Sequence, residues 1–255
     1  MADSTLISWT NHTWNPFIGC TKVSPGCKHC YAETLIERMG GDFTILRKTK
    51  TWGDPGKWQR SCERAGRQDL VFTCSMSDFF HPQADQWRSA VWKIIKDTPS
   101  LIYQILTKRP ERIVENLPPD WNAGYANVWL GISVESPKYL GRMDVLRRVP
   151  AAVHFISAEP LLEDISSEVN LDNIQWVIVG GESGPGYRGM PHEWARRLLT
   201  RCRTHSPAIP FFFKQSAAPR TEMGVTLDGQ HYKELPMGLV LAPGAPVGRK
   251  DTLFG

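Results

Sequence analysis

Short apolar runs that alternate with amphipathic stretches are the feature that most limits how this chain can fold. Six such runs begin at Leu70, Leu101, Val128, Val153, Ile174 and Ile209, and each is rich in β-branched or aromatic residues. Stretches with helical periodicity lie between them, at 84–97, 138–149 and 192–203. Strands that alternate with helices imply right-handed crossovers and a parallel sheet.

A further run near Leu6–Thr10 brings the expected number of strands to about six or seven. The chain has 255 residues, of which 41% are hydrophobic, and an α/β barrel of that length is commonly one domain. We therefore predict a single partial or closed (β/α) barrel over 1–236. The last residues, 237–255, are rich in Gly and Pro, and we predict an irregular tail there.

One strand indicates that the barrel has a functional interior. In VWLGISVES the residues Leu130, Ile132 and Val134 are apolar, whereas Gly131 and the polar residues that alternate with them face the other way. Polar groups also collect where the runs end, and active sites of α/β barrels lie at that rim. These groups are Ser77, Asp78, Thr107, Lys108, Arg109, Ser133, Glu135, Ser157, Glu159, Glu182, Ser183, Lys214 and Gln215.

The charge and the terminal sequence narrow the class of protein. A net charge of +4 permits a polyanionic partner without requiring one. Residues 1–8 lack the basic start and apolar run of a signal peptide, and no segment reaches about 18 uninterrupted apolar residues. We therefore expect a cytoplasmic protein with no membrane segment. Six cysteines in such a protein indicate metal or redox chemistry more than a disulfide framework.

Three cysteines, Cys20, Cys27 and Cys30, lie within eleven residues, in a loop that follows the first expected strand. A disulfide would leave one thiol unpaired, and a tetrahedral Cys3His zinc site would need His12 or His29 as its fourth ligand. The third possibility is a [4Fe-4S] cluster with three cysteine ligands and one open iron, for which three thiols are a complete set. The remaining cysteines, Cys62, Cys74 and Cys202, have no metal spacing, and we expect them to be small buried hydrophobes.

The loop 20–30 and the motifs around it resemble two known groups of proteins. Three clustered cysteines after the first strand of a partial barrel resemble the radical S-adenosylmethionine (SAM) superfamily. The segments WNPFIGCTKVSPGCKHCYAE, SMSDFFH, LTKRPER, WLGISVES, ISAEPLLEDI, WVIVGGESG and FFFKQ resemble the phage Gp37/Gp68 family, a domain of unknown function.

The resemblance implies a role for particular residues. Cys20, Cys27 and Cys30 would ligate a [4Fe-4S] cluster, and its fourth iron would chelate S-adenosylmethionine, which is cleaved to a 5′-deoxyadenosyl radical. An external electron donor would reduce the cluster. Side chains or backbone near the adenine or the methionine part of the cofactor would come from His29, Ser75, Ser77, Asp78, Ser133, Gly180, Gly181 and Glu182. We assign the rim residues Lys108, Glu135, Glu159 and Lys214 to catalysis.

The substrate is less well defined than the cofactor. The segment 38–67 looks irregular and holds eight Lys or Arg against three acidic residues, with Trp52 and Trp58 among them. Such a composition suits a nucleic-acid groove, although a solvated insertion packed on the barrel would explain it too. A second basic group comprises Arg188, Arg196, Arg197, Arg201 and Arg203.

Three functions therefore remain open. The first is a radical SAM enzyme, with nucleic-acid repair or modification as its expected activity. The second is a non-enzymatic nucleic-acid-binding protein with a structural Cys3His zinc site. The third is a zinc hydrolase that uses rim carboxylates, for which the sequence offers no H-x-x-x-H ligand pair. The sequence does not determine the oligomeric state.

Overall fold

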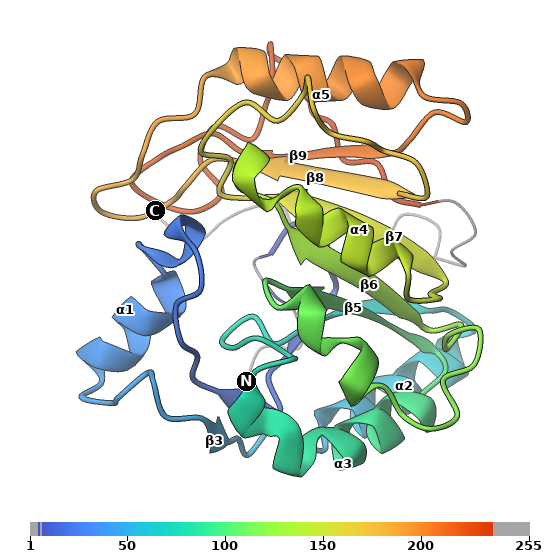
Figure 1. Ribbon diagram of the computed structural model, residues 1–255. Helices are drawn as coiled ribbons and strands as arrows, with labels where there is room; N and C mark the ends of the chain where they lie inside the picture. Colours follow the sequence, from blue (N-terminus) through green and yellow to red (C-terminus); the bar gives the residue numbers. More distant parts are fainter. Residues whose placement is uncertain (1–4, 6, 237–255) are drawn as a thin grey trace.

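A curled sheet of seven strands, in the order β1-β4-β5-β6-β7-β8-β9, forms the centre of the computed structural model, which describes residues 5 and 7–236 (Figure 1). All six pairings are parallel. The strands are β1 (His12–Trp14), β4 (Asp69–Thr73), β5 (Leu101–Thr107), β6 (Val128–Ser133), β7 (Val153–Ala158), β8 (Trp176–Gly180) and β9 (Phe211–Gln215). Because β1 and β9 are the two edges of the sheet, the barrel is partial, and this confirms the predicted fold class.

Five α-helices and a small ribbon complete the described part of the chain. The helices are α1 (Tyr31–Arg38), α2 (Asp54–Ala65), α3 (Asp85–Lys96), α4 (Gly141–Arg147) and α5 (His192–Thr204). The ribbon pairs β2 (Phe17–Ile18) with β3 (Arg47–Lys48). Short 3-10 turns are η1 (Pro25–Cys27), η2 (Pro82–Ala84), η3 (Pro110–Arg112), η4 (Val114–Asn116) and η5 (Pro137–Tyr139). In Figure 1, α1 lies at the open side of the curled sheet, away from the other helices.

Two features differ from the sequence prediction in this region. The first strand begins at His12, beyond the apolar run Leu6–Thr10, since the backbone at Ser8 and Trp9 turns instead of extending. The segment 38–67 is not irregular, because it contains β3 and α2. The predicted tail 237–255 lies outside the described residues. None of the helices in the described part of the chain is long and apolar enough to cross a bilayer.

The alternation predicted for VWLGISVES is confirmed. Leu130 and Ile132 pack in the large cluster between the sheet and the helices, whereas Trp129 packs in a second cluster inside the curled sheet. The inner cluster also holds Trp9, Leu70, Ile102, Phe155, Trp176, Ile178 and Phe212. Gly131 is required there, because a Cβ on it would lie 2.3 Å from the ring of Phe155. The aromatic cluster fills the interior below the strand ends, and the space above it stays open.

Candidate functional site

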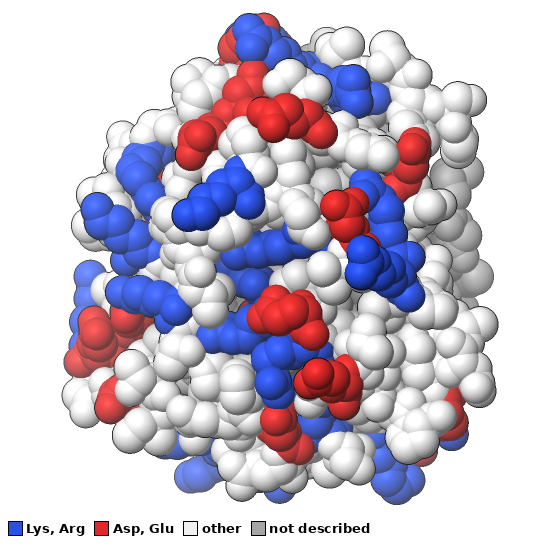
Figure 2. All heavy atoms as spheres, viewed as in Figure 1, with Lys and Arg blue, Asp and Glu red and all other residues white. Residues whose placement is uncertain are grey.

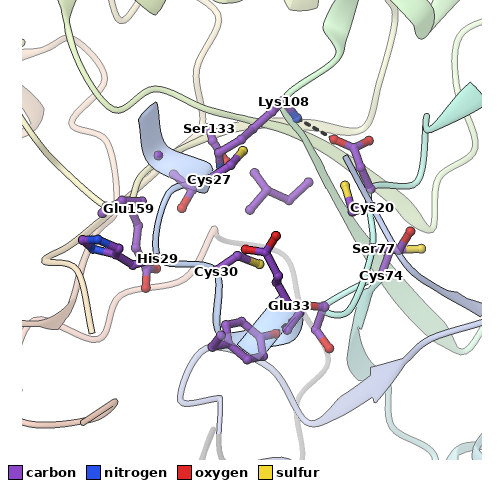
Figure 3. Close-up of a pocket in the computed structure, with 18 of the residues that line it drawn as sticks. Cys20, Cys27, His29, Cys30, Glu33, Cys74, Ser77, Lys108, Ser133 and Glu159 are labelled. Carbon is purple, nitrogen blue, oxygen red and sulfur yellow. Dashed lines mark hydrogen bonds between the residues drawn. The ribbon is translucent and has the colours of Figure 1, made fainter. Parts of the chain in front are cut away.

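A cavity of about 730 Å³ lies at the carboxyl ends of the parallel strands, over the aromatic cluster. Its volume is in the range of pockets that bind small ligands. Most of the predicted site residues line it, from loops far apart in sequence. These are Cys20, Cys27, His29, Cys30, Ser75, Ser77, Asp78, Lys108, Ser133, Glu159, Gly181, Glu182 and Lys214 (Figure 3).

Two predicted site residues lie behind the lining. Glu135 is fully buried, and its Oε2 pairs with Arg142 Nη1 at 2.8 Å. A Cβ on Gly26, in the cysteine loop, would lie 3.2 Å from the Glu135 carboxyl carbon, so this carboxylate packs directly under the loop. Gly180 faces the side chain of Glu159. Neither residue is part of the cavity wall, although both support it.

All three thiols of the loop 20–30 reach the cavity, and all three are partly exposed and reduced. The loop contains the short turn η1, and α1 begins directly after Cys30. Within the described residues, no three His, Cys, Asp or Glu side chains come close enough together to hold one metal ion. His12, one of the two histidines considered as a fourth zinc ligand, contacts Asp69 instead, with its Nε2 3.0 Å from Asp69 Oδ2.

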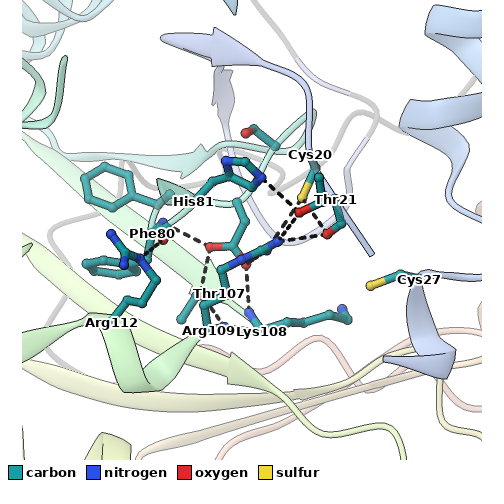
Figure 4. Close-up of polar contacts among 12 residues, drawn as sticks. Cys20, Thr21, Cys27, Phe80, His81, Thr107, Lys108, Arg109 and Arg112 are labelled. Atoms are coloured by element: carbon teal, nitrogen blue, oxygen red, sulfur yellow. Dashed lines mark hydrogen bonds and ion pairs between the residues drawn. The ribbon is translucent and has the colours of Figure 1, made fainter. Parts of the chain in front are cut away.

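Arg109 and Asp78 attach one end of the cysteine loop to β5. Arg109 Nη2 donates to both the carbonyl and the hydroxyl oxygen of Thr21 at 2.8 Å, and Nη1 lies 3.7 Å from Cys20 Sγ (Figure 4). Asp78 Oδ2 accepts from the Lys108 backbone N–H at 2.9 Å and lies 3.3 Å from Arg109 Nη1. Burial raises the pKa of Cys20 to about 11, although Arg109 opposes this shift.

His81 supports the same contact from the other side. Its Nδ1 accepts from the backbone N–H of Gln83, so its proton is on Nε2, which donates to Thr21 Oγ1 at 3.0 Å. Burial and the nearby Arg109 lower the pKa of His81 to about 4, and the ring is therefore neutral at pH 7. Nothing in the local sequence indicates this contact, because Thr21 and His81 meet only in the tertiary structure.

A second set of contacts attaches the other end of the loop to β8. Glu182 Oε2 lies 2.9 Å from His29 Nδ1 and accepts from Arg188 Nε at 2.9 Å. Arg188 Nη2 in turn donates to the carbonyl oxygen of Pro25 at 3.0 Å. Burial disfavours the Glu182 carboxylate, but the hydrogen bonds from Arg188 and His29 outweigh it and lower the pKa to about 2. Glu182 therefore stays ionised and fixes the His29 ring.

Several other predicted residues also have partners within the protein. Ser77 Oγ donates to the Gly19 carbonyl at 2.5 Å, and Ser75 Oγ accepts from Asn15 Nδ2 at 3.0 Å. Lys214 Nζ pairs with Glu159 Oε1 at 2.5 Å. Burial disfavours the Lys214 ammonium, but Glu159 reverses the effect and raises its pKa.

The glycines at the end of β8 allow a close approach of backbone. A Cβ on Gly181 would lie 2.1 Å from the Ala217 nitrogen, which follows β9. The glycine therefore brings the ends of β8 and β9 together and also lines the cavity.

Of the remaining cysteines, Cys62, Cys74 and Cys202 are buried as predicted. Cys74, however, lies one residue beyond β4 with φ of 67°, and it reaches the cavity wall. Burial raises the pKa of all three thiols. Because β4 ends at Thr73, Cys74 lies at the rim of the sheet, beside the site.

Both tryptophans of the segment 38–67 and the five arginines of the second basic group make contacts within the chain. The ring of Trp58 stacks on His12 at 4.4 Å, and Lys48 Nζ lies 4.1 Å above the ring of Trp52. Arg188, Arg196, Arg197 and Arg203 pair with acidic side chains, and Arg201 donates to a backbone carbonyl. Figure 2 shows acidic and basic side chains interspersed on the face it presents. These contacts give a nucleic-acid groove no support.

A family model with the description "Protein of unknown function (DUF5131)" matches residues 4–236 of the chain. Neither the curated proteins nor the solved structures contain a significant match to this chain.

Proposed function

The chain belongs to the DUF5131 family of unknown function, and from its site we propose that it is a radical S-adenosylmethionine enzyme. Cys20, Cys27 and Cys30 would hold a [4Fe-4S] cluster. The observation that carries the proposal is that all three thiols of one loop reach the same cavity, at the carboxyl ends of a partial parallel barrel. That edge of an α/β barrel is where catalytic groups and ligands meet.

The number of thiols in the loop favours a cluster over a single zinc ion. Three cysteines are the complete set for a [4Fe-4S] cluster whose fourth iron is left open to a ligand. A Cys3His zinc site would need a fourth ligand, and the two candidate histidines, His12 and His29, each lie against a carboxylate through one ring nitrogen. The three thiols alone therefore fit a cluster, whereas a zinc site needs a further group.

The cluster and S-adenosylmethionine would together supply the 5′-deoxyadenosyl radical, and the protein would supply position and exclusion of water. Phe72, Leu106 and Trp9 provide an apolar floor for the cavity. Arg109, Glu182 and their partners hold both ends of the cysteine loop, so the thiols are fixed relative to the floor. The hydrogen bond from Arg109 to Cys20 Sγ would also make the cluster easier to reduce.

The contacts of the rim residues divide the predicted roles. Asp78, Glu135 and Glu182 hold the loop or the residues under it, and we assign them to positioning. Lys214 and Glu159 line the cavity as an ion pair, with Glu159 against Gly180, and remain our candidates for catalysis. The hydroxyls of Ser75 and Ser77 already make hydrogen bonds within the protein, so each would contact the cofactor only through its remaining hydrogen-bonding capacity.

A role in nucleic-acid repair or modification is the part of the proposal that the contacts support least. Trp52 and Trp58 are both packed against the protein core, and stacking on unpaired bases would require their faces to be open. A nucleic-acid substrate would therefore have to reach the cavity itself and not the segment 38–67.

Anaerobic purification and reconstitution with iron and sulfide test the proposal. We expect about four irons and four sulfides per chain, and 5′-deoxyadenosine when the reduced protein meets S-adenosylmethionine. Cys27→Ala should lose the cluster and the product, whereas Cys62→Ala, which removes a buried thiol outside the site, should keep both.

Stoichiometric zinc, with no 5′-deoxyadenosine after reconstitution, would contradict the proposal and favour the non-enzymatic zinc protein. Retention of all metal by a folded Cys27→Ala variant would exclude any cluster at the loop. The circular dichroism spectrum of each variant shows whether it is folded.

A further inference from the structure

The cavity wall on the open side of the sheet is one helix thick. Tyr31 and Glu33 of α1 line the cavity, and Figure 3 shows Glu33 beside Cys30. On the outside, Leu35 is 47% exposed, and Met39, the residue after α1, is 75% exposed. The sheet has no strand on this side, because β1 and β9 are its two edges (Figure 1). Among the described residues, α1 therefore stands alone between the cavity and the solvent.

Little packing holds α1 in place. The other four helices each pack against a strand, a turn or another helix, whereas none of these elements makes a comparable contact with α1. Its buried side chains, Ala32 and Ile36, lie with Phe43 in a small cluster apart from the two larger ones. Except for Met76, the described members of this cluster belong to residues 18–43, so α1 packs mainly on its own segment. An element with few buried apolar contacts opens locally at a low cost in free energy.

One hydrogen bond joins α1 directly to the barrel within the described part of the chain. The Tyr31 hydroxyl donates to the carbonyl oxygen of Ser75, which lies just beyond β4. The other polar side-chain contacts of α1 stay within residues 22–34. Before the helix, His29 is held by its contact at the end of β8; after it, Gly40 has φ of 75°, and a Cβ there would meet nothing within 4 Å. The contact of Tyr31 is therefore the bond that keeps the helix against the barrel.

We propose that α1 is a gate through which the substrate enters the cavity, and that it opens when the hydrogen bond from Tyr31 to Ser75 breaks. The strand ends and the loop 20–30 are held by buried ion pairs, such as that between Asp78 and Arg109, and move less easily than α1. Residues at the two ends of a moving element absorb the change in backbone angles. Only the word substrate rests on the proposed function, because the opening of α1 is a property of the chain itself.

Amide hydrogen exchange of the full-length protein without metal tests the opening. We expect the helical amides of residues 31–38 to exchange about tenfold or more faster than those of α3, while α3 stays protected. Tyr31→Phe removes only the hydroxyl, and should make exchange in α1 faster by a further factor of about two to ten. Tyr125→Phe is the matched control. It also loses a hydroxyl hydrogen bond, to Asp120 beside α3, and should leave exchange in α1 unchanged.

Entry to the cavity is measured separately, by labelling Cys27 with maleimides of two sizes. Cys27 lines the cavity and is partly exposed. The rate for fluorescein maleimide, divided by the rate for the small N-ethylmaleimide, reports how readily a bulky molecule enters. Tyr31→Phe should raise this ratio several-fold, whereas Tyr125→Phe should leave it at the wild-type value.

Two results would overturn the inference. One is exchange in residues 31–38 that is as slow in a folded Tyr31→Phe protein as in the wild type. The other is an unchanged maleimide ratio in a Tyr31→Phe protein whose α1 exchanges faster, since α1 would then open without admitting a ligand. Both measurements use the protein without metal, so a failure of the proposed cluster would be seen separately, in the iron and sulfide content.

Discussion

Arg109 Nη2 lies 2.8 Å from both the carbonyl oxygen and the hydroxyl oxygen of Thr21, and this contact joins the end of β5 to the cysteine loop. The two residues are 88 positions apart in the sequence. Arg109 is only 5% exposed, and it also pairs with the buried Asp78. The loop that carries the thiols is therefore anchored by a buried charge and not only by its own turn.

The first prediction concerns this anchor. Arg109→Met leaves Asp78 buried without its ion pair, and should lower the free energy of unfolding by about 3 kcal/mol. Amide hydrogen exchange in residues 20–30 should become faster. Arg112→Met is the matched control, because Arg112 pairs with the half-exposed Asp85 and should cost less than about 1 kcal/mol. Unchanged exchange in the loop of a folded Arg109→Met protein would show that the contact does not anchor it.

The second prediction concerns the close packing inside the sheet. Gly131→Ala puts a methyl group 2.3 Å from the Phe155 ring and should destabilise the protein by about 1–3 kcal/mol. Gly141→Ala, at the start of α4, meets nothing within 4 Å and should be neutral or slightly stabilising. Urea unfolding of the two variants measures the difference. Equal stabilities would mean that the ring of Phe155 moves aside at little cost.

The third prediction is a pH dependence from Glu182. Its pKa is about 2 in the folded protein and 4.5 when unperturbed, so the unfolded chain binds the proton first as the pH falls. The stabilisation is complete above pH 4.5 and is lost as the pH falls toward 2. Glu182→Gln should be less stable at pH 7 by about 2 kcal/mol, allowing for solvent screening of Arg188, and this difference should shrink at pH 3. A constant difference between pH 7 and pH 3 would contradict the assignment.

The fourth prediction separates the six thiols by their reactivity. Iodoacetamide at alkaline pH should label Cys20, Cys27 and Cys30 in the native metal-free protein, because these three are partly exposed, and Cys20 should react slowly, because burial raises its pKa to about 11. The buried thiols Cys62, Cys74 and Cys202 should react only after unfolding. Peptide mass spectrometry gives the extent of labelling at each position. Loading with iron and sulfide should protect the first three, and continued labelling of all of them after loading would be inconsistent with a cluster there.

The sequence by itself determined the sheet and the edge at which the site lies. Continuous apolar runs such as Leu101–Thr107 are typical of buried parallel strands, and the alternation around Gly131 identified the inner face. Both are local properties, because side chains alternate along a strand whatever surrounds it. The three clustered cysteines were identified for a similar reason, because their spacing is also local to one short stretch of the chain. The first strand was predicted too early, near Leu6–Thr10. Trp9 of that run is apolar because it packs inside the sheet, and not because it belongs to a strand.

Only the tertiary structure decided which charged side chains have a partner within the described part of the protein and which do not. From the sequence alone, Asp78, Glu182 and Lys108 are three charged residues at the ends of strands, and nothing indicates which of them has a partner. In the folded chain the first two hold the cysteine loop, and Lys108 stands beside Ser133 with no acidic partner among the described residues. That difference depends on Arg109 and Arg188, whose long side chains reach segments distant in sequence. The strength of an ion pair depends on the distance in space between the two charges, and the separation of two residues along the sequence does not give that distance.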